Sequence, residues 1–155
     1  NRCFDEIEYL NVDILGMKGK SRVITVPADI QKLWNDVRVI LRNPVIARYE
    51  LKEDIQLGKK AGITALCEYS LLSDNEYPTY AITKKEITES GIRKMKQVHS
   101  GEEIGCVVLE LGYFIDFKNK KLEDPLSVTL SLTESEKQDE RIGISIKRML
   151  EEYVW

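Results

Sequence analysis

The sequence predicts a single α+β domain over residues 1–155, in which a mixed or antiparallel sheet packs against about four helices, the last of them long and amphipathic. Three observations lead to this prediction. Short β-branched or apolar runs alternate with stretches in which apolar residues recur every three or four positions. Their order lacks the regular strand–helix–strand rhythm of a parallel α/β fold. The 155 residues contain no repeat, linker or low-complexity tract that would divide the chain.

The N-terminal part is expected to form a β-hairpin followed by a helix. Phe4–Val12 and Ser21–Val26 are the expected strands, because β-branched and aromatic residues favour extended backbone and the glycines between the two runs suit a turn. A helix is expected to begin after Pro27, since the apolar residues of 30–41 recur at helical spacing. Trp34 belongs to this apolar stripe, so we expect it in the core.

The central part is expected to supply the remaining strands and two further helices. Strands are predicted where β-branched and apolar residues are concentrated, and helices where the apolar spacing is three or four. The expected strands are Val45–Leu51, Thr79–Ile82 and one or two strands within Ile104–Phe117, and the expected helices are 63–71 and 85–96.

The C-terminal part holds one ambiguous segment and one clear helix. Residues 125–132 alternate apolar and polar positions, as a strand would, yet Asp124 followed by Pro125 is also a typical helix start. The apolar residues from Ile142 to Tyr153 recur at helical spacing and predict the long amphipathic helix. A capping box formed by Thr133 and Glu136 is a candidate for its start.

Composition restricts the class of protein. The chain is 43% hydrophobic and 32% charged with a net charge of −3, which is enough to build a core without a disulfide or metal. The net negative charge disfavours a general nucleic-acid coat protein. The three widely spaced cysteines are best explained as buried free thiols in a reducing compartment, and we expect a cytoplasmic protein. No apolar run is long enough to span a bilayer.

The residue pattern offers one catalytic alternative. Asp116 and Lys118 form an acid-x-lysine pair at the expected end of an apolar strand, and Glu110 lies six residues earlier. In metal-dependent nucleases of the restriction-endonuclease type, such an acid holds a divalent cation while the lysine stabilises developing negative charge. The alternative is a strand whose charged end simply emerges into solvent. The single histidine, His99, has no cysteine or histidine at ligand spacing, so no metal or cofactor is expected in the leading interpretation.

A group of bases between residues 84 and 96 is a second candidate site. Exposed lysines and arginines at this density can contact phosphate, although the group lacks the interleaved aromatic residues that stack on bases. A solvated helix face explains the same pattern. The five bases are Lys84, Lys85, Arg93, Lys94 and Lys96.

Several segments together resemble a known family. The resemblance extends over nearly the whole chain and includes Ile7–Val12, Leu41–Ile46, Gly62–Leu72, Pro78–Glu86, Asp124–Leu132, Asp139–Arg141 and Met149–Glu152. These segments resemble the effector domain that follows winged-helix DNA-binding domains in bacterial transcriptional regulators similar to AbiEi-type antitoxins of type IV toxin–antitoxin systems.

The resemblance implies a non-enzymatic regulatory domain that recognises a protein partner, such as a nucleotidyltransferase-like toxin, or a second copy of itself. DNA would then be bound only by a winged-helix domain missing from the N-terminus. The resemblance also favours a helix over residues 125–132, with Ser127 and Ser131 on one side as a contact ridge. The expected partner-binding residues are therefore Asp124, Ser127, Ser131 and Arg141. The alternatives are close packing of the serines against a neighbouring helix, and a structural dimerisation module built on the C-terminal helix.

Overall fold

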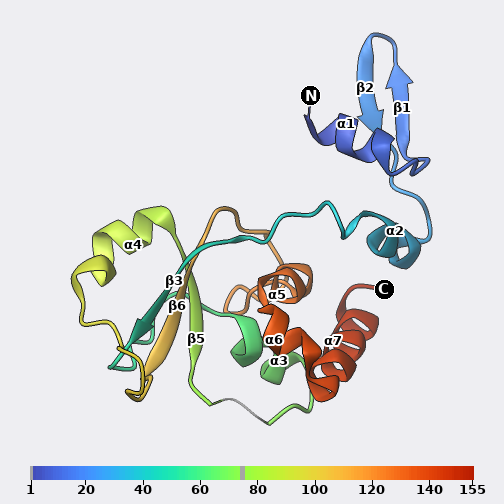
Figure 1. The fold of residues 1–155 in the computed structure, drawn as a ribbon. Coiled ribbons are helices and arrows are strands. Elements are labelled where there is room, and N and C mark those ends of the chain that lie inside the picture. The colour runs from blue at the N-terminus through green and yellow to red at the C-terminus, as the bar shows by residue number, and fades with distance from the viewer. Residues whose placement is uncertain (1, 74–75) are drawn as a thin grey trace. The chain divides into compact units, whose positions relative to one another are not determined.

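The computed structural model describes residues 2–73 and 76–155, which group into two compact units, residues 2–42 and residues 43–154 (Figure 1). The sequence led us to expect one domain, whereas the contacts within the chain divide it into these two units. The α+β class is confirmed, because the described residues form seven α-helices, a two-stranded sheet and a four-stranded mixed sheet. The helices are more numerous than the four expected, since several are short.

The first unit consists of a helix, a hairpin and a second helix. Strands β1 and β2 pair antiparallel, and Gly19 adopts a φ of +65° in the turn between them, a conformation that glycine tolerates best. The prediction that Phe4–Val12 is a strand was wrong, because most of this segment is helical and buries Ile7 on one side. The elements are α1 (Arg2–Tyr9), β1 (Leu15–Lys18), β2 (Ser21–Ile24) and α2 (Ile30–Val37).

Helix α2 shows the expected apolar stripe over a shorter length. Asp29 caps it by accepting a hydrogen bond from the Lys32 amide at 2.8 Å. Trp34 is buried, as predicted. The helix ends at Val37, so the last apolar positions of the stripe, up to Leu41, lie beyond it.

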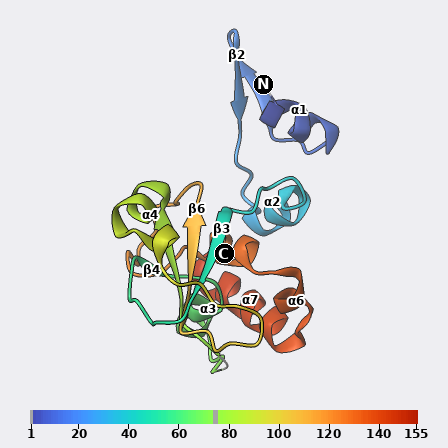
Figure 2. The ribbon, with the colours of Figure 1, turned by 60° about the vertical axis from the view of Figure 1, so that its left-hand side comes forward.

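The second unit is built on the four-stranded sheet, in the order β3-β6-β5-β4 (Figures 1 and 2). Strands β5 and β6 run parallel, and the two outer pairings are antiparallel. The predicted strands at 45–51 and 79–82 are confirmed. The bounds are β3 (Val45–Leu51), β4 (Lys59–Lys60), β5 (Thr79–Thr83) and β6 (Cys106–Leu111).

Helices cover both faces of this sheet. Figure 1 shows α4 on one side and α3, α5 and α7 gathered on the other. The expected helix at 63–71 is confirmed, and residues 125–132, left open between strand and helix, are helical. The bounds are α3 (Gly62–Tyr69), α4 (Lys84–Ser90), a 3₁₀ turn η1 (Ile92–Lys94), α5 (Pro125–Ser131), α6 (Glu134–Gln138) and α7 (Glu140–Tyr153).

The core lies in two layers on the two faces of the sheet. Alternate residues of β6 belong to different layers, because side chains of a strand point to opposite faces. The layer toward α4 contains Leu51, Tyr80, Ile82, Ile87, Ile92, Cys106 and Val108. The opposite layer contains Ala61, Ala81, Val107, Leu109 and Leu111. Burial on both faces explains why β6 is apolar at every position except Glu110 rather than alternating.

Two boundaries differ from those expected. The strand expected within 104–117 ends at Leu111, so Asp116 lies in irregular chain and not at a strand end. The Thr133–Glu136 capping box exists, but it begins the short helix α6. The chain then turns, and Asp139 caps the separate 14-residue helix α7. Local capping signals were therefore correct, while their assignment to one long helix was wrong.

The cysteines only partly match the expectation of buried thiols. None of the three is in a disulfide, but Cys3 is exposed and Cys67 is partly exposed, whereas Cys106 is buried. The helices of the described residues include none with the length and apolar character required to cross a bilayer.

Candidate functional site

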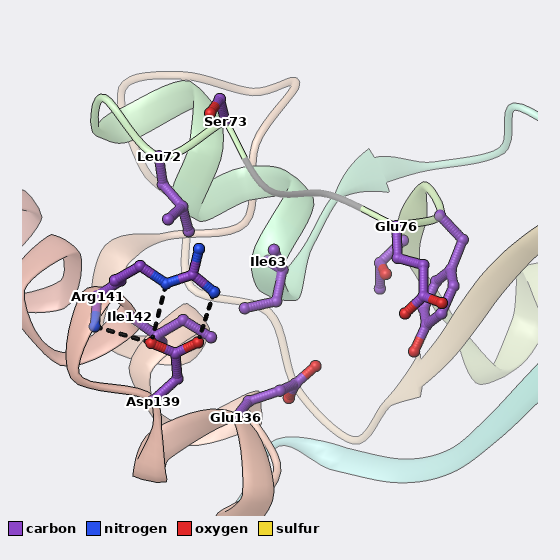
Figure 3. A pocket seen from close by; sticks show the side chains of 10 residues that line it. Ile63, Leu72, Ser73, Glu76, Glu136, Asp139, Arg141 and Ile142 are labelled. Carbon is purple, nitrogen blue, oxygen red and sulfur yellow. Dashed lines mark hydrogen bonds and ion pairs between the residues drawn. The ribbon is translucent and has the colours of Figure 1, made fainter.

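A pocket of about 510 Å³ opens in the second unit, between the first turn of α3 and the junction of α6 and α7. Figure 3 shows it from close by. Apolar and charged side chains from segments far apart in the sequence meet there. The lining residues are Ile63, Leu72, Ser73, Glu76, Tyr77, Thr79, Glu136, Asp139, Arg141 and Ile142.

Arg141 and Asp139 are held together on one side of this pocket (Figure 3). Asp139 caps α7, since its Oδ1 accepts the Arg141 amide at 2.8 Å. Its Oδ2 lies 2.9 Å from Arg141 Nη2, which makes an ion pair. Hydrogen bonds from the Arg141 side chain and backbone lower the pKa of Asp139. The cap and the ion pair together fix the guanidinium near the pocket.

Two further carboxylates contribute to the pocket lining. Glu136 Oε2 accepts hydrogen bonds from the Thr133 amide at 2.6 Å and the Thr133 hydroxyl at 2.9 Å. Glu76 is exposed. Ile63, Leu72 and Ile142 supply apolar surface between these charges. The pocket is therefore suited to an apolar side chain of a partner that also carries polar or charged groups to meet the rim.

A buried carboxylate, Glu123, lies behind the start of α3. Its side chain is 1% exposed, and its Oε2 accepts hydrogen bonds from the Gly62 amide at 3.2 Å and the Ser131 hydroxyl at 3.4 Å. Its Oε1 has no hydrogen-bond partner within the described chain. Burial raises the pKa of Glu123 from 4.5 to about 7. Because Gly62 directly precedes Ile63, this carboxyl group supports the backbone that forms one wall of the pocket.

Three of the four residues expected to contact a partner are buried. Asp124, Ser127 and Ser131 are each at most 8% exposed. Asp124 caps α5 by accepting the Ser127 amide at 2.9 Å, and the serines face the neighbouring elements of their own unit. Close packing, the alternative interpretation, explains them. Arg141 is the member of the set that is exposed and lines the pocket.

The two acids of the nuclease hypothesis lie in different surroundings. Glu110 is buried on β6, where it accepts a hydrogen bond from Tyr49 Oη at 2.9 Å and pairs with Arg93. Asp116 is exposed and lines a different, shallow hollow together with Thr83. Lys118 lies beyond it in irregular chain. Among residues 2–73 and 76–155, no group of three or more candidate ligands is placed to hold a metal ion.

The five bases of the phosphate hypothesis are all exposed, on α4, η1 and the residues that follow. Lys85 lies 3.7 Å from Glu89, four residues along the same helix. Arg93 pairs with the buried Glu110 at 3.1 Å. The structure thus brings these bases to one region of the second unit.

The pocket could not be found from the sequence. Ile63, Leu72 and Glu76 gave no functional signal, because apolar helix residues and surface acids are common anywhere. The sequence did contain a signal for the burial of Glu123. It is an acid between Leu122 and the helix start at Asp124-Pro125, a point where the chain enters the core. Comparison with known proteins adds no constraint: no family model, no curated protein and no solved structure matches the chain.

Proposed function

We propose that this chain is a non-enzymatic, partner-binding domain of a cytoplasmic bacterial transcriptional regulator or antitoxin, and that a protein partner is bound at the pocket beside Arg141. The observation that supports the proposal is the pocket itself. It combines apolar surface from Ile63, Leu72 and Ile142 with an arginine whose orientation is fixed by Asp139. Arginine and apolar pockets are the features that dominate binding energy at protein interfaces.

The resemblance to effector domains of AbiEi-like regulators supplies the identity of the proposed partner. In that family the domain would bind a nucleotidyltransferase-like toxin encoded beside the regulator, and an N-terminal winged-helix domain would bind the operator. Of the four residues expected to contact the partner, we retain Arg141 as a contact residue, because the other three are buried. A second copy of the chain is the competing occupant of the pocket.

Substitution of Leu72 tests the pocket. We expect Leu72→Asp to weaken binding of a nucleotidyltransferase-like protein that is captured with the tagged chain by about 2 kcal/mol or more, roughly thirtyfold, because it places a charge in a desolvated contact. Arg141→Glu should weaken it similarly. Isothermal titration calorimetry of the purified pair measures the change directly.

Ile144→Asp is the matched control. Ile144 is 63% exposed on α7 and does not line the pocket, so its substitution should leave affinity within about twofold. Equal losses of affinity for Leu72→Asp and Ile144→Asp would argue against the pocket. If light scattering showed a dimer that Leu72→Asp converts to a monomer, the occupant would be a second copy rather than a toxin.

A further inference from the structure

An exposed arginine on the opposite side of the sheet from α3, α5 and α7 is held by a buried carboxylate and a partly buried tyrosine. Arg93 Nη2 donates to Glu110 Oε2 at 3.1 Å and to Oε1 at 3.4 Å, and its Nε donates to Tyr49 Oη at 3.3 Å. Tyr49 Oη in turn donates to Glu110 at 2.9 Å. Glu110 is 4% exposed, whereas Arg93 is 50% exposed. The guanidinium is therefore held by Glu110 and Tyr49 while the Arg93 side chain remains half exposed.

The charge of this cluster is well defined. Burial alone would raise the pKa of Glu110, but hydrogen bonds from Arg93 and Tyr49, with the nearby charge of Lys84, lower it overall. The carboxylate is thus ionised and neutralises one positive charge. The hydrogen bonds that Arg93 donates to Glu110 and Tyr49 use Nε and Nη2, and its Nη1 is engaged in none of them. Nη1 therefore remains able to donate to a phosphate oxygen.

Three further lysines lie on the same stretch of chain as Arg93. Lys84 begins α4, Lys94 ends η1 and Lys96 follows, and all three are exposed. Within the described residues none of these three lysines forms an ion pair. The acids of the same segment are engaged, since Glu86 belongs to the capping box of α4 and Glu89 pairs with Lys85. The local excess of positive charge contrasts with a net charge of −3 for the chain.

We propose that Lys84, Arg93, Lys94 and Lys96 form a binding surface for the phosphate backbone of double-stranded nucleic acid. The charges are single and are spread along a helix and the turn that follows it. Such an arrangement matches the repeated phosphates of a nucleic-acid backbone better than it matches one phosphate monoester. Binding to the backbone is favoured over base stacking because the aromatic member, Tyr49, is committed to Glu110 and Arg93. Glu110 acts as a positioning residue for Arg93. This surface is distinct from the pocket beside Arg141 and does not depend on the function proposed for it.

The test is fluorescence anisotropy of the full chain with a labelled 20-base-pair DNA duplex over a series of salt concentrations. The triple variant Lys84→Ala, Lys94→Ala, Lys96→Ala should bind about tenfold or more weakly at low salt. Its log–log salt slope should fall by about 3, one for each lysine that no longer neutralises a phosphate. A matched triple variant, Lys118→Ala, Lys120→Ala, Lys121→Ala, removes the same charge from exposed positions elsewhere and should keep the wild-type slope.

Glu110→Gln tests the positioning role. It keeps all five bases and removes the negative charge that neutralises Arg93, so charge alone would tighten binding, whereas loss of the fixed Arg93 position is expected to weaken it several-fold. Circular dichroism checks that the variant is folded. Two outcomes would overturn the proposal. One is an equal loss of affinity in both lysine triples, which would indicate net charge alone. The other is the absence of duplex binding by the folded wild-type chain at low salt.

Discussion

Replacing Glu123 by glutamine is expected to remove most of a pH dependence of stability between about pH 4.5 and pH 7. The carboxyl group is 1% exposed, and burial raises its pKa from 4.5 to about 7. The folded state therefore binds the proton more tightly than the unfolded state. The resulting stabilisation is complete below about pH 4.5 and is lost as the pH rises through about 7. The difference is about 3 kcal/mol, at about 1.4 kcal/mol for each pKa unit.

The groups around Glu123 explain the direction of the shift. The negative charge of Asp124 adds to the effect of burial, while the Gly62 amide, the Ser131 hydroxyl and Lys59 partly oppose it. Tyr69 and Tyr113 are also close enough to interact electrostatically with Glu123, and the pKa of each is raised. A neutral glutamine can keep the acceptor for Gly62 without a buried charge.

Urea unfolding at a series of pH values measures this effect as the difference between wild type and Glu123→Gln. The variant should be the more stable of the two at pH 8, and the difference should shrink toward pH 5. Carboxylates with lowered pKa values, such as Glu86 and Asp139, act in the opposite direction at lower pH but are common to both proteins. Glu103→Gln, at an exposed carboxylate, is the control. A constant difference across the pH range would show that Glu123 does not titrate in this window.

Alanine at Gly58 is expected to destabilise the second unit strongly. Gly58 has a φ of +77°, and a Cβ built there would lie 2.2 Å from Ile82 Cγ2 and 2.3 Å from the Ala81 carbonyl oxygen of β5. A left-handed conformation costs a residue with a Cβ about 1–2 kcal/mol. Overpacking against a buried strand adds about 1–3 kcal/mol. Together the free energy of unfolding should fall by about 3 kcal/mol, because neither the strand backbone nor fully buried Ile82 can easily move aside.

Gly91→Ala separates the two causes. Gly91 has a similar φ of +71°, but a Cβ there would meet no atom within 4 Å. We therefore expect it to cost only the conformational part, about 1 kcal/mol. Chemical denaturation of both variants gives the comparison. Equal destabilisation would mean that the close approach of Gly58 to β5 relaxes without cost.

Local patterns in the sequence were sufficient for several elements. The strand at 45–51, the strand at 79–82 and the helix at 63–71 were all located, because buried segments carry dense apolar or β-branched runs. The caps at Thr133 and Asp124 were also visible, since a cap is a contact between residues three positions apart. The pattern could not tell whether one helix or two followed Thr133, because residues 133–141 contain no apolar residue whose spacing would mark a break at Asp139.

The first helix shows why a local pattern can mislead. The segment from Phe4 to Val12 has aromatic and β-branched residues that suit a strand, yet helix α1 buries Ile7 and joins Arg2 to Glu6 in an ion pair one turn apart. Packing of one face decides between two conformations whose intrinsic preferences differ little. The acid-x-lysine pair was placed wrongly for a related reason. The nuclease hypothesis required Asp116 at a strand end, and the strand ends at Leu111.

The sequence by itself therefore determined the α+β class, the central strands and helices, and the exposed bases from Lys84 to Lys96, because hydrophobic period, capping and charge are properties of neighbouring residues. Only the tertiary structure decided that Glu110 holds Arg93, that Glu123 is buried against the start of α3, and that Ile63, Leu72 and Arg141 share one pocket. These contacts join residues between 9 and 78 positions apart in the chain, the largest separation being that between Ile63 and Arg141. When a distant segment buries a side chain, the residues next to it in the sequence do not indicate that burial.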